Sequence, residues 1–259
     1  MNRITNINIE TKDGKILVLC PEKTNSYFIA PDGFYKTTTL RTINELCGFR
    51  KTMSASMLNV IKAKTCPMFK SFKITFKDGG QIGFDDNGFY QTTDDIPNVE
   101  LITSRKFPMI HRSSDEIVEK LNEMFPGTDY CYRKSPFRKV FYTAKVNAMN
   151  EQITTTKFGD INGPIDFAPN GLSTGERNLF IILYTLICNQ GKENIILFDE
   201  LDYMHVAFQQ TIGFSIYKNR TNQIIMATHS PFVTAGCPEN LVEFNFKNHE
   251  DFFKEDKKK

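Results

Sequence analysis

The hexapeptide IILFDE occupies residues 195–200. Its apolar residues predict a buried strand, and the carboxylates of Asp199 and Glu200 follow at the carboxyl end of that strand. In parallel sheets, ligands bind beyond the carboxyl ends of the strands. In such a place Asp199 can hold Mg²⁺, directly or through water, and Glu200 can polarise an attacking water molecule. The alternative is purely structural, because a buried strand has to end in polar residues where it reaches the surface.

Helices and apolar strands alternate around this hexapeptide. Helical patterns over about 176–189 and 206–218 precede apolar runs at 194–198 and 223–227. Continuous apolar strands between helices indicate a mostly parallel sheet that is covered on both faces. The predicted fold class is therefore α/β.

A capped helix start precedes the hexapeptide at residues 171–177, GLSTGER. Ser173 and Glu176 have the spacing of a capping box ahead of an apolar helix. Gly175 allows close access to the backbone, and the N-terminus of a helix attracts anions. The segment is either a helix cap alone or a cap that also binds an anion.

A histidine follows the second apolar run. Residues 228–231 read THSP, so His229 stands directly after the strand predicted at 223–227. Next to Asp199 and Glu200, this side chain can contact the γ-phosphate of a nucleotide. The alternative is a structural histidine whose hydrogen bonds are satisfied within the fold.

Together, these motifs resemble those of ABC-type ATPases. LSTGE at 172–176 resembles the ABC signature, the Asp-Glu pair at 199–200 resembles Walker B with its catalytic glutamate, and residues 228–231 resemble the switch histidine segment. They occur in the order that the family uses. The resemblance is to soluble, non-transporter members of the wider AAA family, including SMC-like DNA-repair and overcoming-lysogenisation-defect proteins, and it covers 26–48 and 171–246.

The family places a phosphate-binding P-loop between a strand and a helix near the N-terminus. Residues 30–38, APDGFYKTT, fit the frame G-x-x-x-x-G-K-[ST], with Lys36 and Thr37 in the lysine and hydroxyl positions. Ala30 and Tyr35 replace the two glycines, so this Walker A motif is degenerate. Because strained backbone at a residue other than glycine costs about 1–3 kcal/mol, Tyr35 is expected to weaken the phosphate cradle.

The resemblance implies ATP and Mg²⁺ as ligands. It assigns nucleotide binding to Asp32, Gly33, Lys36, Thr37, Thr38, Ser173 and Gly175. It assigns Mg²⁺ to Thr37 and Asp199, and catalysis to Glu200 and His229. Two chains, in a homodimer or an ABC-type heterodimer, would stack head to tail, so that the signature of one closes on the γ-phosphate held by the other.

The function implied is that of an ATPase that binds and hydrolyses ATP. Closure of its head-to-tail dimer would drive or gate a protein effector, in DNA repair or phage defence. The rival hypothesis is a nucleotide-impaired adaptor that acts through protein or DNA contacts. Tyr35 favours the adaptor, whereas the intact Asp199, Glu200, Ser173 and His229 count against it.

The chain of 259 residues is predicted to be a single ABC-type ATPase domain. Its nucleotide-binding core is assigned to 1–50 and 157–247, an inserted lobe to 51–156 and a charged tail to 248–259. The sheet is expected to be mixed, with a parallel centre, an antiparallel N-terminal part and an irregular middle lobe. Strand-like runs lie at 4–9, 15–20 and 26–30 in the N-terminal part, and a hairpin is predicted at 69–84 within the middle lobe.

Composition indicates a globular protein, with 40% hydrophobic and 24% charged residues and a net charge of +2. No apolar run approaches the roughly 20 residues of a membrane span, and no signal-peptide core begins the sequence. We therefore expect a cytoplasmic protein without a membrane partner. Near-neutral charge disfavours non-specific attraction to nucleic acid. The aromatic and basic stretch at 130–142 is either a nucleic-acid surface or a strand with a charged outer face.

Overall fold

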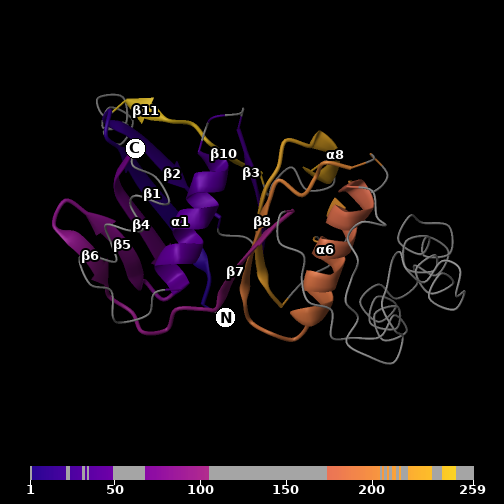
Figure 1. Ribbon diagram of the computed structural model, residues 1–259. Coiled ribbons are helices and arrows are strands. Elements are labelled where there is room, and N and C mark those ends of the chain that lie inside the picture. The colour runs from indigo at the N-terminus through magenta and orange to yellow at the C-terminus, as the bar shows by residue number, and fades with distance from the viewer. Residues whose placement is uncertain are drawn as a thin grey trace, which may run out of the picture.

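Two sheets carry the strands of the computed structural model (Figure 1), and the fold is α/β as predicted. The aromatic and basic stretch at 130–142 lies outside the described part of the chain. The structure describes residues 2–21, 24–30, 33, 35–48, 68–104, 174–204, 206, 209, 212–213, 216, 221–234 and 241–248.

The first sheet is antiparallel and has the strand order β11-β2-β1-β4-β5-β6. Buried and half-exposed residues alternate along β1 and β4, as expected of strands with one face on the core. The strands predicted at 4–9 and 15–20 and the hairpin at 69–84 are confirmed. The strands are β1 (Ile4–Thr11), β2 (Lys15–Leu19), β4 (Phe69–Phe76), β5 (Gln81–Asp85), β6 (Gly88–Gln91) and β11 (Lys247–Asn248).

The second sheet is parallel and has the strand order β10-β3-β9-β8-β7. All residues of β8 and β9 are buried, which explains their continuous apolar sequences. The strand that leads to His229, β9, therefore lies between the strand before the predicted P-loop, β3, and the strand of the hexapeptide, β8. The strands are β3 (Asn25–Ile29), β7 (Val99–Thr103), β8 (Ile195–Asp199), β9 (Gln223–Ala227) and β10 (Leu241–Glu243).

Strand β7 was not predicted from the sequence. Its five residues are all half-buried, because it pairs only with β8 at the edge of the parallel sheet. Residues 69–103, assigned above to an inserted lobe, thus contribute three strands to the antiparallel sheet and one to the parallel sheet.

Helices lie on both faces of the parallel sheet. Helix α1 (Lys36–Gly48) lies between the two sheets, and α6 (Thr174–Cys188) covers the opposite face of the parallel sheet (Figure 1). Alternate residues of β8 serve the two layers: Ile195 and Leu197 belong to the core around α1, and Ile196 and Phe198 to the core around α6. Burial of both faces holds the carboxyl ends of the strands in one fixed edge.

One buried glutamine joins the two sheets. Gln223, at the start of β9, accepts a hydrogen bond from the backbone N–H of Ile4 at 2.8 Å. Its amide nitrogen donates to the carbonyl oxygens of Ile4 and Pro21, each at 2.8 Å. The side chain thereby provides partners for backbone groups of Ile4 and Pro21 at the junction of the two sheets.

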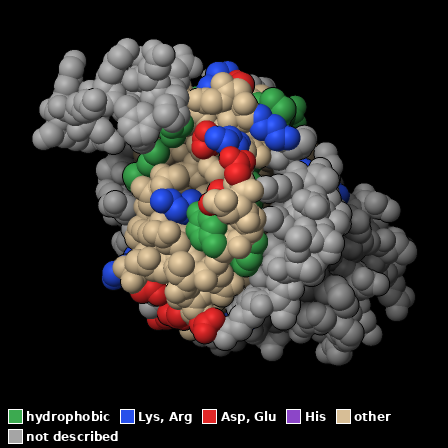
Figure 2. Space-filling view, turned by 90° about the vertical axis from the view of Figure 1, so that its left-hand side faces the viewer, with side chains coloured by type: hydrophobic (Ala, Val, Ile, Leu, Met, Phe, Trp, Pro, Cys, Tyr) green, Lys and Arg blue, Asp and Glu red, His purple; other side chains and the backbone are tan. Residues whose placement is uncertain are grey.

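Acidic and basic side chains are interspersed on the face of the molecule beside the antiparallel sheet (Figure 2). Lys70 on β4 pairs with Glu10 at 2.9 Å and Asp86 at 3.7 Å. None of the helices in the described ranges is both long and apolar enough to span a membrane. The short helix α8 (Pro231–Thr234) completes the described elements.

Candidate functional site

The predicted P-loop leads from β3 into α1 through left-handed backbone. Gly33 has φ 80° and Tyr35 has φ 62°, and α1 begins at the next residue, Lys36. A positive φ is ordinary for glycine, whereas it costs about 1–2 kcal/mol for a residue with a Cβ. The tyrosine thus adopts the backbone that the missing glycine of the motif would adopt without strain. Asp32 lies outside the described residues.

Two phenylalanines hold the ring of Tyr35. Its centroid lies 5.7 Å from that of Phe69 on β4 and 5.7 Å from that of Phe246, both edge to face. Such aromatic pairs contribute about 0.5–1.5 kcal/mol each, which is comparable to the backbone strain. The ring contacts therefore offset the cost of the left-handed conformation and tie the loop to the antiparallel sheet.

The N-terminus of α1 is suited to an anion. The first N–H groups of a helix have no partner inside it, and the helix dipole places partial positive charge there. The first turn of α1 contains no acidic residue. Lys36 is 5% exposed, and its ammonium donates to the carbonyl oxygen of Ala30 at 2.7 Å. Thr38 uses its carbonyl oxygen inside the helix, where it accepts from the Thr42 hydroxyl at 2.8 Å.

The hydroxyl of Thr37 meets the first carboxylate of the hexapeptide. Thr37 Oγ1 donates to Asp199 Oδ1 at 2.8 Å across 162 residues of sequence. Burial raises the pKa of Asp199, and the neighbouring charge of Glu200 raises it further, against the lowering effects of the Thr37 hydrogen bond, Arg41 and Lys36. A cation at this point would stabilise the ionised carboxylate.

The oxygen atoms of Thr37 and Asp199 fit Mg²⁺, which prefers hard oxygen ligands. Among the described residues, no three His, Cys, Asp or Glu side chains come together as a metal cluster. Mg²⁺ is commonly held by one or two protein oxygens together with water and substrate phosphates. The donor pair therefore fits a metal that arrives with a phosphate ligand.

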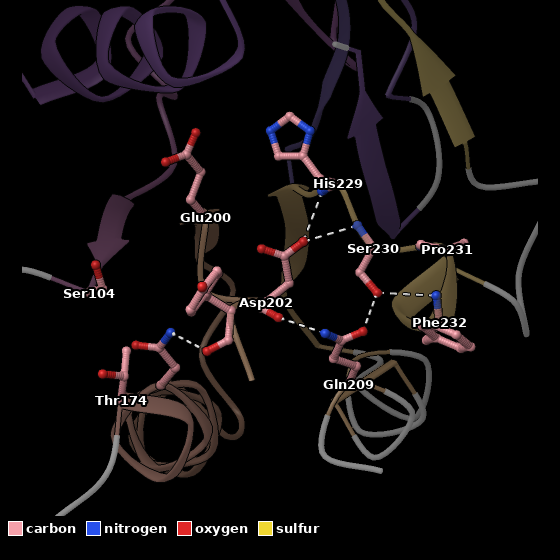
Figure 3. Close-up of a pocket in the computed structure, with 11 residues that line it drawn as sticks. Ser104, Thr174, Glu200, Asp202, Gln209, His229, Ser230, Pro231 and Phe232 are labelled. Atoms are coloured by element: carbon pink, nitrogen blue, oxygen red, sulfur yellow. Dashed lines mark hydrogen bonds between the residues drawn. The ribbon is translucent and has the colours of Figure 1, made fainter. Parts of the chain in front are cut away.

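Glu200 follows Asp199 at the end of β8, His229 lies just after β9, and both residues are exposed. Glu200 has φ 51°, and its N–H donates to the Ala227 carbonyl at 3.3 Å. Figure 3 shows both side chains directed to the same side, away from Thr174. Strained backbone at a non-glycine residue is typical of functional sites.

A cavity of about 630 Å³ lies next to Glu200 and His229. Lys36, Thr37 and Asp199 are not among the described residues that line it. Thr174, at the N-terminus of α6, lines the same cavity as Glu200 and His229. Gly175 is half-buried on α6, and Ser173 lies outside the described residues. The lining residues are Ser104, Thr174, Asn178, Glu200, Asp202, Tyr203, Gln209, His229, Ser230, Pro231 and Phe232.

Asp202 is a further residue at this site, and it was not predicted from the sequence. Its Oδ2 atom accepts from the His229 N–H at 2.8 Å and from the Ser230 N–H at 3.0 Å (Figure 3). The same atom accepts from the Thr228 hydroxyl at 2.6 Å. Its partners lie 26 to 28 residues away, so no local pattern indicates the contact. The only sequence signal is its position two residues after Glu200.

A second residue missed is Gln209, in the helix predicted over 206–218. Its amide nitrogen donates to the carbonyl oxygens of Asp202 at 2.9 Å and Met204 at 2.8 Å. Its amide oxygen accepts from the Ser230 hydroxyl. Gln209 therefore joins the segment after β8 to the segment after β9.

No protein-family model matches this chain, and no curated protein matches it significantly. One similar solved structure is an SMC head bound to the C-winged helix domain of ScpA, with 14% identity, a TM-score of 0.49 and coverage of 96% of this chain and 99% of that chain. Another is a bacterial Atm1-family ABC exporter with ATP bound, with 15% identity and a TM-score of 0.43. This chain spans 41% of the exporter's length, and 98% of this chain is covered.

Proposed function

We propose that this chain is an ABC-type ATPase that binds Mg-ATP between the N-terminus of α1 and the carboxyl end of β8. The observation that carries the proposal is the 2.8 Å hydrogen bond between Thr37 and Asp199, which joins the P-loop hydroxyl to the strand carboxylate. Lys36, which directly precedes Thr37, supplies a buried positive charge at the N-terminus of α1.

Each residue has a defined task in the bound state. The Lys36 ammonium and the first N–H groups of α1, from Lys36 to Thr38, bind the nucleotide phosphates, and Asp32 and Gly33 shape the loop around them. Thr37 and Asp199 hold Mg²⁺, which neutralises phosphate charge when bound.

Glu200 and His229 act on the terminal phosphate. The exposed Glu200 carboxylate orients and polarises the attacking water, and His229 contacts the γ-phosphate. Support comes from their common direction at the sheet edge (Figure 3) and from the left-handed backbone of Glu200. The chain thus has separate groups for binding phosphate and for activating water.

We further propose that two chains, identical or of two ABC types, close head to tail on ATP. Ser173 and Gly175 of the second subunit would then cover the γ-phosphate. Exposed apolar side chains support an interface at this end of the molecule: Tyr203 is 81%, Phe232 44% and Val206 38% exposed. Closure would drive or gate a protein effector in DNA repair or phage defence, as the resemblance implies.

Calorimetric titration with Mg-ATP tests the binding site. Lys36→Ala should lower the affinity at least about tenfold, because a charge-assisted hydrogen bond contributes about 1.5–3 kcal/mol. Lys70→Ala is the matched control, since it removes a lysine from the antiparallel sheet, where Lys70 pairs with Glu10. Binding by the wild type that is indifferent to Lys36→Ala would place the nucleotide elsewhere and contradict the proposal.

The alternative function is the nucleotide-impaired adaptor. The observation that favours it is the Tyr35 ring, which Phe69 and Phe246 fix in the predicted cradle. The same titration distinguishes the two functions. If the wild type does not bind ATP and Tyr35→Gly restores binding, the loop is silenced and the adaptor is supported.

A further inference from the structure

We propose that Asp202 is a positioning residue that holds His229 and Glu200 in a fixed relation at the sheet edge. The inference rests on the proposed ATPase function and goes beyond it. Asp202 itself is 9% exposed and is placed to act through its neighbours.

The Asp202 carboxylate and its donors from Thr228 to Ser230, together called the clasp below, connect the segment after β8 to the segment after β9. One carboxylate oxygen of Asp202 accepts hydrogen bonds from three consecutive residues, Thr228 to Ser230, at 2.6 to 3.0 Å. Two of the donors are backbone N–H groups, so the contact fixes the main chain at His229 directly. Hydrogen bonds to an ionised acceptor are roughly twice as strong as those between neutral groups.

The clasp is buried, although the ring that it positions is not. Thr228 is 0% and Ser230 8% exposed, whereas His229 is exposed. Loss of the carboxylate would leave the buried Ser230 N–H with only the Thr228 hydroxyl at 3.0 Å. Buried polar groups that lose a partner are costly, so the segment would rearrange to recover one.

Asp202 also restrains the segment that carries Glu200. It lies two residues after Glu200, whose φ of 51° requires support from the surrounding structure. Gln209 makes a second connection between the same two segments. Its amide nitrogen donates to the Asp202 carbonyl at 2.9 Å, and its amide oxygen accepts from the Ser230 hydroxyl. Asp202 therefore links the water-activating residue to the phosphate-sensing residue.

A double-mutant cycle on phosphate release tests this role. Asp202→Ala should lower kcat about 100-fold with little change in the KM for ATP, because misplacement of a catalytic group by about 1 Å can cost that factor. In a His229→Ala background the same change should cost clearly less than about 100-fold, because the part of the effect that acts through His229 is already lost and only the part that acts through Glu200 remains. Equal factors in both backgrounds would overturn the inference.

Amide hydrogen exchange provides a readout that does not need turnover. In Asp202→Ala the amides of His229 and Ser230 should exchange at least about tenfold faster, while those of β9 keep their protection. The conservative Asp202→Asn keeps an acceptor oxygen and should recover part of both effects. Thr228→Val, which removes one donor, keeps the test available if Asp202→Ala does not fold.

Asp78→Ala is the matched control. Asp78 also holds a backbone N–H, that of Gly80 at 2.8 Å, but in the turn between β4 and β5. It should alter neither turnover nor exchange at His229. Unchanged exchange in all Asp202 and Thr228 variants would overturn the clasp, whereas absence of wild-type turnover with faster exchange would overturn the ATPase function and leave the clasp a structural feature only.

Discussion

Two residues other than glycine, Tyr35 and Glu200, have a positive φ within the described part of the chain. Tyr35 lies two residues before Thr37, and Glu200 directly follows Asp199, so backbone strain flanks both members of the proposed metal pair. The sequence indicated the cost at Tyr35 but not its compensation. The compensating rings belong to Phe69 and Phe246, which are distant in the chain and which no local pattern connects to the loop.

Substitutions at Tyr35 separate strain from packing. Tyr35→Ala and Tyr35→Gly both lose the ring, but only glycine also relieves the left-handed backbone at φ 62°. We expect Tyr35→Gly to have a free energy of unfolding about 1–2 kcal/mol higher than Tyr35→Ala. Denaturant unfolding of the two variants measures this difference. Equal stabilities would show that residue 35 does not adopt the left-handed conformation.

Asp199 gives a pH-dependent prediction. Its pKa is raised in the folded state, chiefly by burial, so the folded chain binds this proton more tightly than the unfolded chain. Its ionisation therefore opposes folding at neutral pH, and the opposition is relieved as the pH falls through the raised pKa.

Asp199→Asn should consequently melt at a higher temperature than the wild type at pH 7, with a difference that disappears below the ordinary pKa of 3.8. Asparagine can still accept the Thr37 hydrogen bond, so the contact at 2.8 Å is retained in the variant. The same variant should lose Mg²⁺-dependent ATP binding. Thermal unfolding across the pH range checks the first part, and a lower melting temperature at pH 7 would contradict it.

At the scale of elements, the sequence pattern predicted the strands that are buried on both faces of the parallel sheet. The continuous apolar runs of β8 and β9 are explained by burial on both faces of the parallel sheet. Strand β7 was missed because an edge strand that is half-buried throughout gives no clear alternation.

The junction of the two sheets depends on Gln223. Gln223→Ala removes hydrogen bonds to the N–H and C=O of Ile4 and to the C=O of Pro21. We expect the free energy of unfolding to fall by about 2–4 kcal/mol, since buried backbone groups lose their partners. Gln91→Ala, which loses one hydrogen bond to the Thr93 carbonyl at 2.7 Å, should cost less than about 1 kcal/mol. Urea denaturation of both variants would contradict the account if the two losses were equal.

At the scale of the whole molecule, the proposed P-loop and the cavity beside Glu200 lie at the same edge of one parallel sheet. The sequence motifs indicated that these sites lie close together. The predicted P-loop follows β3, the Asp199-Glu200 pair ends β8 and His229 follows β9, and these three parallel strands end at the same edge of the sheet. The motifs could not predict the cavity or the exposed aromatic residues around it, because its lining brings together α6, α8 and the segments after β8 and β9, which are far apart in the sequence.

ATP-dependent assembly depends on the exposed residues. In a Glu200→Gln background, which should retain ATP, sedimentation should show a dimer with Mg-ATP and a monomer without it. Tyr203→Ser should weaken that dimer at least about tenfold, because a side chain 81% exposed in the free chain would become buried. Met68→Ser, which changes a residue 43% exposed next to β4, is the control and should leave assembly unchanged.

Phosphate release from Mg-ATP by the purified chain is the decisive measurement for ATP hydrolysis at this sheet edge. We expect measurable turnover by the wild type and a loss of at least about 100-fold in Glu200→Gln, with ATP still bound by the variant. Equal turnover by the wild type and Glu200→Gln, or turnover by neither with no bound ATP, would contradict the assignment of this sheet edge as an ATP-hydrolysing site.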